Sequence, residues 1–474
     1  MKKLNHLSVR ELLSGYKAKE FSPEEVTKAY LEEISSEDGR IGAYITVSEN
    51  TAKPACTDKN APLYGVPYSL KDNIITKDIR TTCASKMLSD FIPPFSSSVY
   101  EKLTETGGIL IGKTNLDEFA MGSSTENSAI KITRNPLNTE YVPGGSSGGS
   151  AASVAAFEAA FSLGTDTGGS VCQPASFCGI TGLNPTYGLV SRYGLIGFAP
   201  GFDRIGTLTR NVYDSALVLS QIAFHDSKDS TSVYREQKDY TQGIENGVKG
   251  IRVGIISEFL NDGADRRITD AVRHAATTLE KLGAYVDEIS LPILSHSASC
   301  YLVLSSSEAY STLSRYDGLR YGFSPDNALS LTDLYIRTRS RGFGDEVKRR
   351  LLSGSVFLSN ECFEKYYRRA EKARSLICES YRKAFESYDI LISPVTPAFP
   401  HKIGEKPESV SERFLSDRYT CCANLAYLPS LSLPVGKADN GFSTSVLLTA
   451  KAFGEDILLR TGYALEKALG GAEE

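Results

Sequence analysis

The feature that most constrains the fold is the pattern of residues 64–206, where short apolar runs alternate with glycine- and serine-rich loops and helical stretches. Residues 109–111 (Ile-Leu-Ile) and 161–163 (Phe-Ser-Leu) are apolar runs of strand length, and residues 150–160 have the composition of a helix. This alternation is typical of a β-sheet whose strands are connected through helices. It predicts an α/β fold for this part of the chain.

The flanking sequence extends the same fold class. Ser8 and Glu11 form a capping box, which predicts the start of a helix near the N-terminus. Residues 252–256 and 389–393 are predicted to be further strands, and residues 333–384 to be long, charged helices.

The length of 474 residues by itself favours about three domains. However, the chain has no low-complexity linker, no proline-rich spacer and no internal repeat. We therefore expect a single α/β domain over residues 1–474.

Composition excludes several classes of protein. The net charge is -5, so a strong electrostatic attraction to nucleic acid is not expected, and a partner would hold most of any RNA. Nine cysteines occur without a Cys-x-x-Cys pair, which argues against a disulfide framework or a zinc site. Reduced thiols predict a cytoplasmic protein. We expect neither a signal peptide nor a membrane span, because the N-terminus is charged and no apolar run reaches about eighteen residues.

Residues 107–114 (GGILIGKT) match the phosphate-loop pattern G-x-x-x-x-G-K-[ST]. A phosphate loop follows a strand and presents its backbone N–H groups from a glycine-rich turn. Here the preceding residues are helical in character, and the middle of the match is itself a predicted strand. The match therefore does not predict ATP binding in this chain.

Three other motifs have simpler interpretations. Residues 145–149 match the G-x-S-x-G elbow of α/β-hydrolases, but a loop precedes them where that motif needs a strand. Ser128 and Lys131 match S-x-x-K without the K-T-G partner of penicillin-binding enzymes. Residues 365–374 (KYYRRAEKAR) mix aromatic and basic side chains, which favours a solvated helix face over an RNA-binding strip.

Three segments together could carry amide hydrolysis, which needs an oxygen nucleophile, a base and donors for the oxyanion. Thr167, Gly168, Gly169 and Ser170 follow a predicted strand, and such a turn can gather backbone N–H groups into one concavity. Lys71 lies in a mostly uncharged stretch, and burial could make it a base. Residues 143–153 (PGGSSGGSAAS) supply hydroxyls that could relay a proton. These considerations leave the choice among the many serines open.

The same segments resemble the amidase signature family, in the K-D-N context of Lys71, the GGSSGGS loop and the GTDTGGS segment followed by Q-P-A. The resemblance implies one domain with a mixed central β-sheet flanked by helices and a signature core at about residues 64–206. It also implies a Ser-Ser-Lys triad. Lys71 would be the base, Ser146 the relay serine in a cis backbone geometry, and Ser170 the nucleophile. The N–H groups from Thr167 to Ser170 would form the oxyanion hole.

Residues 117–129, 305–322 and 337–354 further resemble the A-subunit family of the aspartyl/glutamyl-tRNA amidotransferases. That resemblance implies glutamine as the substrate. Further expected site residues are Arg350 for the glutamine carboxylate, Asp417 for its α-amino group and Tyr301 as part of the pocket wall. The implied partners are subunits B and C in a heterotrimer, with tRNA held mainly by B. ATP and Mg²⁺ would act on a partner subunit, and this chain would carry no metal or cofactor.

The sequence departs from the family pattern at Cys172, where arginine is usual, and at residues 440–447. These departures motivate one alternative, a stand-alone small-molecule amidase. A second alternative, from a different class, is a catalytically weak scaffold subunit. The sequence does not decide whether Asp-tRNA(Asn) is also served.

Overall fold

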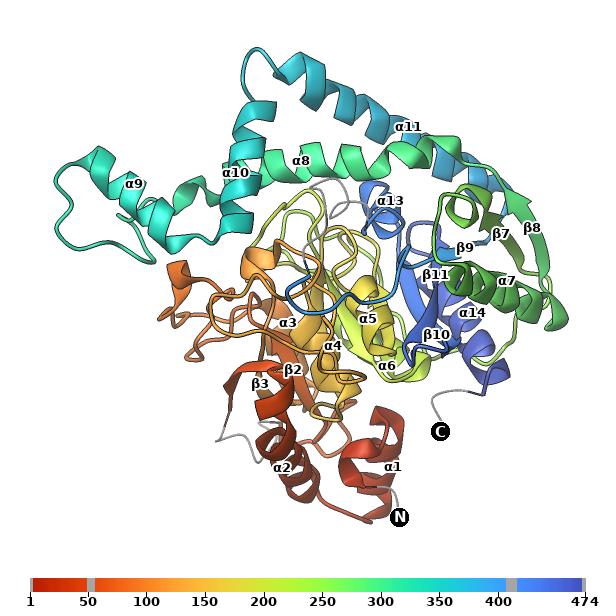
Figure 1. Ribbon diagram of the computed structural model, residues 1–474. Helices are drawn as coiled ribbons and strands as arrows, with labels where there is room; N and C mark the ends of the chain where they lie inside the picture. The colour runs from red at the N-terminus through yellow and green to blue at the C-terminus, as the bar shows by residue number, and fades with distance from the viewer. Residues whose placement is uncertain (1–2, 49–55, 406–415, 471–474) are drawn as a thin grey trace.

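The computed structural model describes residues 3–48, 56–405 and 416–470 (Figure 1). The helices are α1 (Val9–Ala18), α2 (Pro23–Ile41), α3 (Ser98–Glu105), α4 (Gly148–Ala155), α5 (Cys172–Cys178), α6 (Val212–Ile222), α7 (Arg266–Lys281), α8 (Ser297–Thr312), α9 (Leu331–Gly342), α10 (Asp345–Phe357), α11 (Arg368–Ser387), α13 (Thr420–Leu425) and α14 (Glu455–Ala468). The strands are β1 (Tyr44–Val47), β2 (Pro67–Lys71), β3 (Ile109–Thr114), β4 (Phe161–Asp166), β5 (Thr181–Asn184), β6 (Arg204–Thr209), β7 (Arg252–Ile256), β8 (Tyr285–Ile289), β9 (Ile390–Pro394), β10 (Ser430–Lys437) and β11 (Ser443–Ala450).

All of these strands belong to one 11-stranded sheet in the order β1-β3-β2-β4-β6-β5-β10-β11-β9-β7-β8. Parallel pairs (β2 with β3 and β4, β7 with β8 and β9) lie toward the two ends of the sheet, and the pairs between them, such as β4 with β6, are antiparallel. The expected mixed central sheet with flanking helices is therefore confirmed. β5 pairs with β10, so a single sheet joins strands from both halves of the chain.

Most predicted elements are present. The predicted strands at 109–111, 161–163, 252–256 and 389–393 lie in β3, β4, β7 and β9, and the capping box of Ser8 and Glu11 begins α1. The stretch predicted to form long, charged helices, residues 333–384, lies in α9, α10 and α11.

The helix predicted for residues 150–160 was wrong at its end. α4 stops at Ala155, and Phe157 has a positive φ of 58°, which does not occur within a right-handed helix. The chain has to turn there because Phe161 already begins β4.

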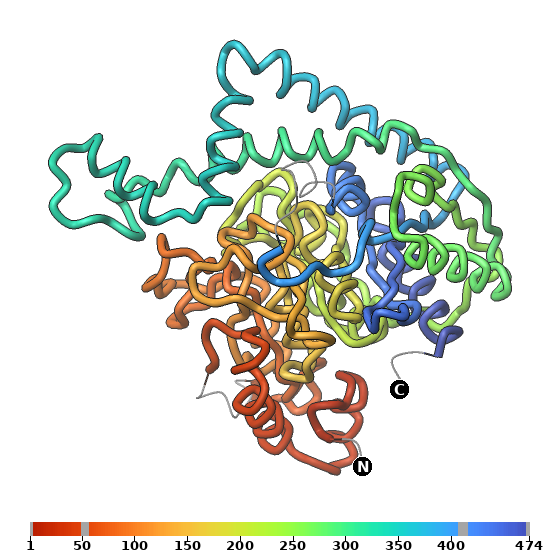
Figure 2. The backbone as a smooth tube through the Cα atoms, in the orientation of Figure 1, coloured from red at the N-terminus to blue at the C-terminus, as the bar shows by residue number. Residues whose placement is uncertain are grey.

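A layer of helices lies beyond the ends of the strands, beside the loop after β4, where Tyr301 of α8 lies against Gly168 (Figure 1). α8 packs against α10, α11 and α13, while α9 projects to the side (Figures 1 and 2). Their buried apolar side chains form a cluster that includes Tyr301, Val347 and Ile377. Among the described residues, no helix is long and apolar enough to cross a membrane.

The direction of the strands positions the candidate site. β2 and β4 are parallel neighbours, so their carboxyl ends lie at the same edge of the sheet. Lys71 is the last residue of β2, and Thr167 follows the last residue of β4. Two segments that are almost a hundred residues apart are therefore brought together at one edge.

Candidate active site

Lys71 is fully buried, and its amine is surrounded by oxygen atoms. Its Nζ lies 2.7 Å from Ser146 Oγ, 2.8 Å from Ser147 Oγ and 3.2 Å from Thr165 O. No carboxylate is within ion-pair distance of Lys71 in the part of the chain that the structure describes. Hydroxyl and carbonyl oxygens can accept hydrogen bonds from an amine, but they do not neutralise a charge as a carboxylate does.

This environment determines the protonation of Lys71. Burial lowers the pKa of Lys71 to about 7, and the more distant carboxylates of Asp117, Asp166 and Asp203 act in the opposite direction. At neutral pH a large fraction of the amine is therefore unprotonated. An unprotonated amine has a lone pair and can act as a general base.

The hydrogen bonds around Lys71 fit a neutral amine, which has two N–H donors and one lone pair. Thr165 O can only accept, so it takes one N–H. Ser147 Oγ directs its own proton to Thr165 O at 3.0 Å, so it accepts the second N–H of Lys71. The lone pair is then left for the hydroxyl proton of Ser146, at 2.7 Å. In the neutral form of the amine, the two adjacent serines therefore have different roles.

The loop that carries Ser146 is fixed by buried hydrogen bonds. The Gly145–Ser146 peptide bond is cis, as the resemblance implied. The Gly145 N–H donates to Gln173 Oε1 at 2.8 Å, and Gln173 Nε2 donates to Ser123 O at 3.0 Å. Ser146 O accepts from the Asp117 N–H at 3.2 Å.

Ser170 lies on the turn between β4 and α5 and is 8% exposed. Its carbonyl oxygen accepts a hydrogen bond from the Ser147 N–H at 3.2 Å, which joins the two serine loops directly. Among the described residues, its hydroxyl has no hydrogen-bond partner. The structure therefore brings Lys71 and Ser146 into contact and places Ser170 on the adjoining loop, without a hydrogen bond between Ser146 and Ser170.

Asp166 organises the backbone of the loop that contains Ser170. One carboxylate oxygen accepts from the Gly169 N–H, and the other accepts from the Val171 N–H, both at 2.7 Å. The Gly169 N–H is therefore directed at Asp166. The hydrogen bonds of the described residues include none from the N–H groups of Thr167, Gly168 or Ser170, so these three are available to an oxyanion.

The three residues expected to bind substrate lie near one another, since the charges of Arg350 and Asp417 both act on the pKa of Tyr301. The ring of Tyr301 lies against Gly168, since a Cβ added at Gly168 would be 2.4 Å from Tyr301 Cζ. Arg350 is 6% exposed, and its guanidinium lies 5.3 Å from the centre of the Phe198 ring. Asp417 precedes α13, which packs against α8, the helix of Tyr301.

The charges of Arg350 and Asp417 are set by their neighbours. Arg350 Nε donates to Glu346 Oε1 at 2.9 Å within α10, which orients the guanidinium. Burial raises the pKa of Asp417 to about 7, and Arg350 opposes that rise. A cationic ligand beside Asp417 would lower this pKa and favour the carboxylate form.

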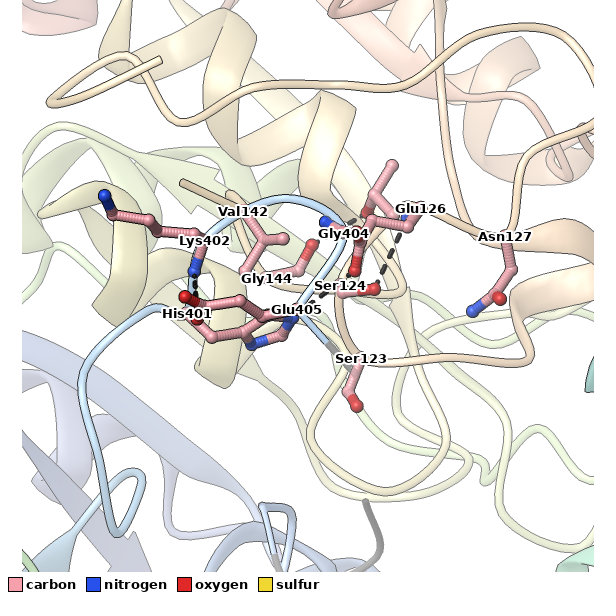
Figure 3. Close-up of polar contacts among 12 residues, drawn as sticks. Ser123, Ser124, Glu126, Asn127, Val142, Gly144, His401, Lys402, Gly404 and Glu405 are labelled. Carbon is pink, nitrogen blue, oxygen red and sulfur yellow. Dashed lines mark hydrogen bonds and ion pairs between the residues drawn. The ribbon is translucent and has the colours of Figure 1, made fainter. Parts of the chain in front are cut away.

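A strap of residues 396–405 is fastened to the segment that precedes Ser146 (Figure 3). His401 Nε2 lies 3.3 Å from Glu126 Oε2, and the Gly404 N–H donates to Glu126 Oε1 at 2.8 Å. The Val142 N–H donates to His401 O at 3.1 Å. The strap is thus anchored to both edges of the segment between residues 123 and 144.

The folded structure also argues against a phosphate loop at residues 107–114. Its lysine, Lys113, is buried in β3 with Nζ 3.3 Å from Asp72 Oδ1 and 2.8 Å from Thr81 Oγ1. The cation is therefore neutralised inside the protein and is not presented to phosphates.

The other motifs also have structural roles. Ser147, the serine of the elbow match, follows a loop and is bonded to Lys71. Lys131 of the S-x-x-K match pairs with Asp38 at 3.5 Å, and the Ser128 hydroxyl donates to Asn115 Oδ1. In residues 365–374, most basic side chains are exposed to solvent.

Neither departure from the family pattern touches Lys71, Ser146 or Ser170. Cys172 Sγ lies 3.8 Å from Gly182 O and 3.9 Å from Ser430 O, on the side of α5 that faces the sheet. Residues 440–447 form the turn before β11 and its first half.

The sequence did not point to Ser147, Asp166 and Gln173 as organisers of the site. Ser147 could have been found from its position beside Ser146 in the GGSSGGS loop. The roles of Asp166 and Gln173 depend on the folded turn, since each bonds backbone atoms that only the tertiary structure brings near.

Comparison with known proteins identifies the family. The family model described as Amidase matches residues 25–459. The glutamyl-tRNA(Gln) amidotransferase A-subunit of Halothermothrix orenii is 45% identical, with 98% of each chain covered. The glutamyl-tRNA(Gln) amidotransferase A-subunit 2 of Clostridium acetobutylicum is 47% identical over 97% of this chain and 98% of its own. The crystal structure of the glutamyl-tRNA(Gln) amidotransferase A-subunit from Thermotoga maritima has a TM-score of 0.85 at 37% identity, covering 100% of this chain and 96% of that one.

Proposed function

This chain belongs to the amidase family, and we propose that it releases ammonia from the side-chain amide of glutamine as the glutaminase subunit of a tRNA-dependent amidotransferase. The observation that carries the proposal is the buried amine of Lys71, which lies 2.7 Å from Ser146 Oγ. The relatives at 45–47% identity over nearly the full length supply the substrate class.

In the first step Ser170 attacks the carboxamide carbon of glutamine. Ser146 accepts the proton of the Ser170 hydroxyl while its own proton moves to the lone pair of Lys71. The negative charge that develops on the amide oxygen is stabilised by the N–H groups of Thr167, Gly168 and Ser170. One such donor is typically worth about 2.7–4 kcal/mol in the transition state.

In the second step the tetrahedral intermediate collapses. The C–N bond breaks, the proton held by Lys71 returns through Ser146 to the leaving nitrogen, and ammonia departs. A glutamyl ester remains on Ser170. Water then attacks this ester with the same base, and the products are glutamate and free enzyme, so the overall reaction is glutamine plus water to glutamate plus ammonia.

Substrate recognition needs one cationic and one anionic partner for the two ends of an α-amino acid. Arg350 can grip the α-carboxylate in two places. Asp417 would hold the α-ammonium group, and the ring of Tyr301 would form the wall between them and Gly168. Because burial raises the pKa of Asp417 to about 7, glutamine binding is expected to weaken below neutral pH.

The partners follow from the same relatives. Ammonia would pass to a second subunit that activates Glu-tRNA(Gln) with ATP and Mg²⁺ and converts it to Gln-tRNA(Gln). The complex would be a heterotrimer with subunits B and C in the cytoplasm, with tRNA held mainly by B. The net charge of -5 and nine free cysteines are in keeping with this arrangement.

The test uses the full chain co-expressed with its partner subunits, in wild-type form and as Ser170→Ala. We expect the variant to lose both ammonia release from glutamine and glutamine-dependent formation of Gln-tRNA(Gln). Added ammonium chloride should restore Gln-tRNA(Gln) formation, because the partner's chemistry is intact. That restoration is the control for correct assembly.

Two other outcomes correspond to the alternatives. Full glutamine-dependent amidation by Ser170→Ala would establish a scaffold role and refute catalysis at Ser170. Equal hydrolysis of glutamine and simple primary amides by the chain alone, with no response to partners or tRNA, would indicate a stand-alone amidase.

A further inference from the structure

The short helix α13 is attached to the loop of the proposed nucleophile by two buried hydrogen bonds. Thr420 Oγ1 donates to Gly168 O at 2.7 Å. One turn later, Asn424 Nδ2 donates to Asp166 Oδ1 at 2.6 Å. Both side chains are almost completely buried, with Thr420 2% and Asn424 1% exposed.

The first of these bonds acts on the peptide unit between Gly168 and Gly169, which lies between the N–H groups of Gly168 and Ser170. Gly168 O belongs to the turn that presents the N–H groups of Thr167, Gly168 and Ser170. A Cβ added at Gly169 would lie 2.1 Å from Thr420 Oγ1, so the turn is in direct contact with Thr420. The orientation of the turn is therefore fixed from outside by α13.

The second bond acts through Asp166. Asp166 Oδ1 receives Asn424 Nδ2 and the Gly169 N–H together, while Oδ2 receives the Val171 N–H. Asn424 is itself held, because its Oδ1 accepts from Asn184 Nδ2 at 3.0 Å. Asp166 thus transmits the position of α13 to the backbone on both sides of Ser170.

The same helix is continuous with Asp417. The Cys421 N–H donates to Asp417 O at 3.0 Å, and Thr420 Oγ1 also lies 3.2 Å from Asp417 O. The Thr420 hydroxyl is therefore within hydrogen-bond distance of Asp417 O and of Gly168 O, and its single proton is directed at the nearer acceptor, Gly168 O.

Resting on the proposed function, we infer that Thr420 and Asn424 are positioning residues that couple α-amino recognition at Asp417 to the geometry of the oxyanion hole. A substrate held at Asp417 has its carboxamide set at a fixed place relative to α13. Because α13 also fixes the Gly168 turn, the amide oxygen is placed opposite the N–H groups of that turn. The hydrogen bonds are to protein atoms and not to substrate, so their loss should lower kcat more than it raises KM.

The central variant is Thr420→Val, which keeps the shape of the side chain and removes the hydroxyl. We expect kcat for glutamine to fall about 5- to 10-fold, the size expected for one neutral hydrogen bond, with KM changed by less than about twofold. Thr420→Ser keeps the hydroxyl and should remain within about twofold of the wild type.

A matched control is Thr461→Val in α14. Thr461 is also fully buried, and its hydroxyl donates to Ile457 O at 2.8 Å, but its helix packs against β10, β11 and α6, away from the nucleophile loop. This variant should leave both kcat and KM unchanged. Equal loss of kcat in Thr461→Val and Thr420→Val would show that any buried threonine has the same effect, and would overturn the inference.

The coupling itself is tested by combining Thr420→Val with Asp417→Asn. Without the amino-group anchor, the position of the substrate amide relative to α13 is no longer fixed. Thr420→Val should then lower kcat/KM by less than about twofold. Independent, additive losses would refute the coupling. Asn424→Ala tests the second hydrogen bond, and we expect kcat to fall as in Thr420→Val. A rise in KM with kcat unchanged would contradict the inference.

The assays use the full chain in complex with its partner subunits, with ammonia release from glutamine as the readout. Absence of glutamine hydrolysis by the wild type would refute the proposed function. Normal hydrolysis by the wild type with equal behaviour of Thr420→Val and Thr461→Val would refute the coupling alone.

Discussion

Two lysines on adjacent strands are equally buried but have different hydrogen-bond and ion-pair partners. Lys71 ends β2 and Lys113 lies in β3, and both are fully buried. Leu70 pairs with Lys113 and Lys71 with Thr114, so the two lysines project from opposite faces of the sheet. On one face Lys113 meets the carboxylate of Asp72, and on the other Lys71 meets hydroxyl and carbonyl oxygens.

The difference shows that the partner of a buried lysine decides its chemistry. Burial lowers the pKa of both amines. At Lys113 the carboxylate of Asp72, 3.3 Å away, opposes this effect and forms a structural ion pair. At Lys71 the nearest groups are neutral, and the pKa falls to about 7. Only the second lysine is suited to accept a proton during a reaction.

The largest expected effect is on catalytic activity, which should be lost when Lys71 is replaced and kept when Lys113 is replaced. Lys71→Met should lower kcat/KM for glutamine by at least about 10³-fold, because it removes the base. Lys113→Met should leave kcat/KM of the folded protein within about threefold. Active-site titration of folded enzyme is needed to make the two values comparable, and equal losses would remove the distinction.

The second prediction concerns stability, for which Lys113 is expected to be needed and Lys71 is not. Lys113→Met leaves the Asp72 carboxylate buried and unpaired, so the free energy of unfolding should fall by about 3–5 kcal/mol. Lys71→Met removes an amine that is costly to bury, and it should raise the free energy of unfolding by about 1–2 kcal/mol at pH 8. Urea denaturation measures both.

Its control is the double variant Lys113→Met with Asp72→Asn. Removing the uncompensated charge should recover part of the lost stability. A Lys113→Met protein as stable as the wild type would contradict the structural role of the ion pair.

The third prediction concerns pH. In the proposed mechanism Lys71 acts as a neutral base, so log kcat at saturating glutamine, which excludes the weaker binding expected when Asp417 is protonated, should rise by about one unit per pH unit up to about pH 7 and then level off. The free energy of unfolding should also depend on the protonation of Lys71. The folded-state pKa of about 7 lies below the unfolded value of 10.5, so the unfolded chain binds more protons between these two values. The stability of the wild type relative to Lys71→Met should therefore increase as the pH rises from about 7 to about 10.5.

A flat pH–rate profile between pH 5 and 8 would contradict a base of this pKa. An unchanged profile in Lys113→Met is the matched control, since that amine does not take part in the reaction.

The smallest expected effect concerns an ion pair near the surface, which contrasts with the buried pair of Lys113. Glu126 and His401 are 3.3 Å apart, but the His401 side chain is 37% exposed, so solvent screens the interaction. Glu126→Gln keeps an acceptor for the Gly404 N–H and should cost less than about 1 kcal/mol of stability. A loss as large as that of Lys113→Met would mean that the strap contributes far more than its exposure indicates.

Much of the site could be predicted from local sequence. The glycines and serines of residues 143–153 and 162–175 predicted turns next to strands, and the resemblance to the amidase signature family selected Lys71, Ser146 and Ser170 from many candidates. The contact between Lys71 and Ser146 agrees with that selection, while the catalytic roles of the three residues stay predictions.

The rest depends on contacts between distant segments. Asp72 follows Lys71 directly, yet its partner Lys113 is known only from the pairing of β2 with β3. The bond from Thr420 to Gly168 joins residues 252 positions apart, and no periodicity or turn signal marks it. The bond from the Gly169 N–H to Asp166 is local, but it depends on how this one turn folds.

The most direct test of the central claim is the pH dependence of covalent labelling of Ser170 by a fluorophosphonate, with the labelled peptide located by mass spectrometry. This measurement needs neither tRNA nor ammonia transfer. We predict labelling at Ser170 alone, at a rate that rises up to about pH 7 and then levels off, that is lost in Lys71→Met and that is retained in Lys113→Met. Labelling of Lys71→Met at the wild-type rate, or labelling at Ser147 instead of Ser170, would contradict a serine nucleophile activated by a neutral buried lysine.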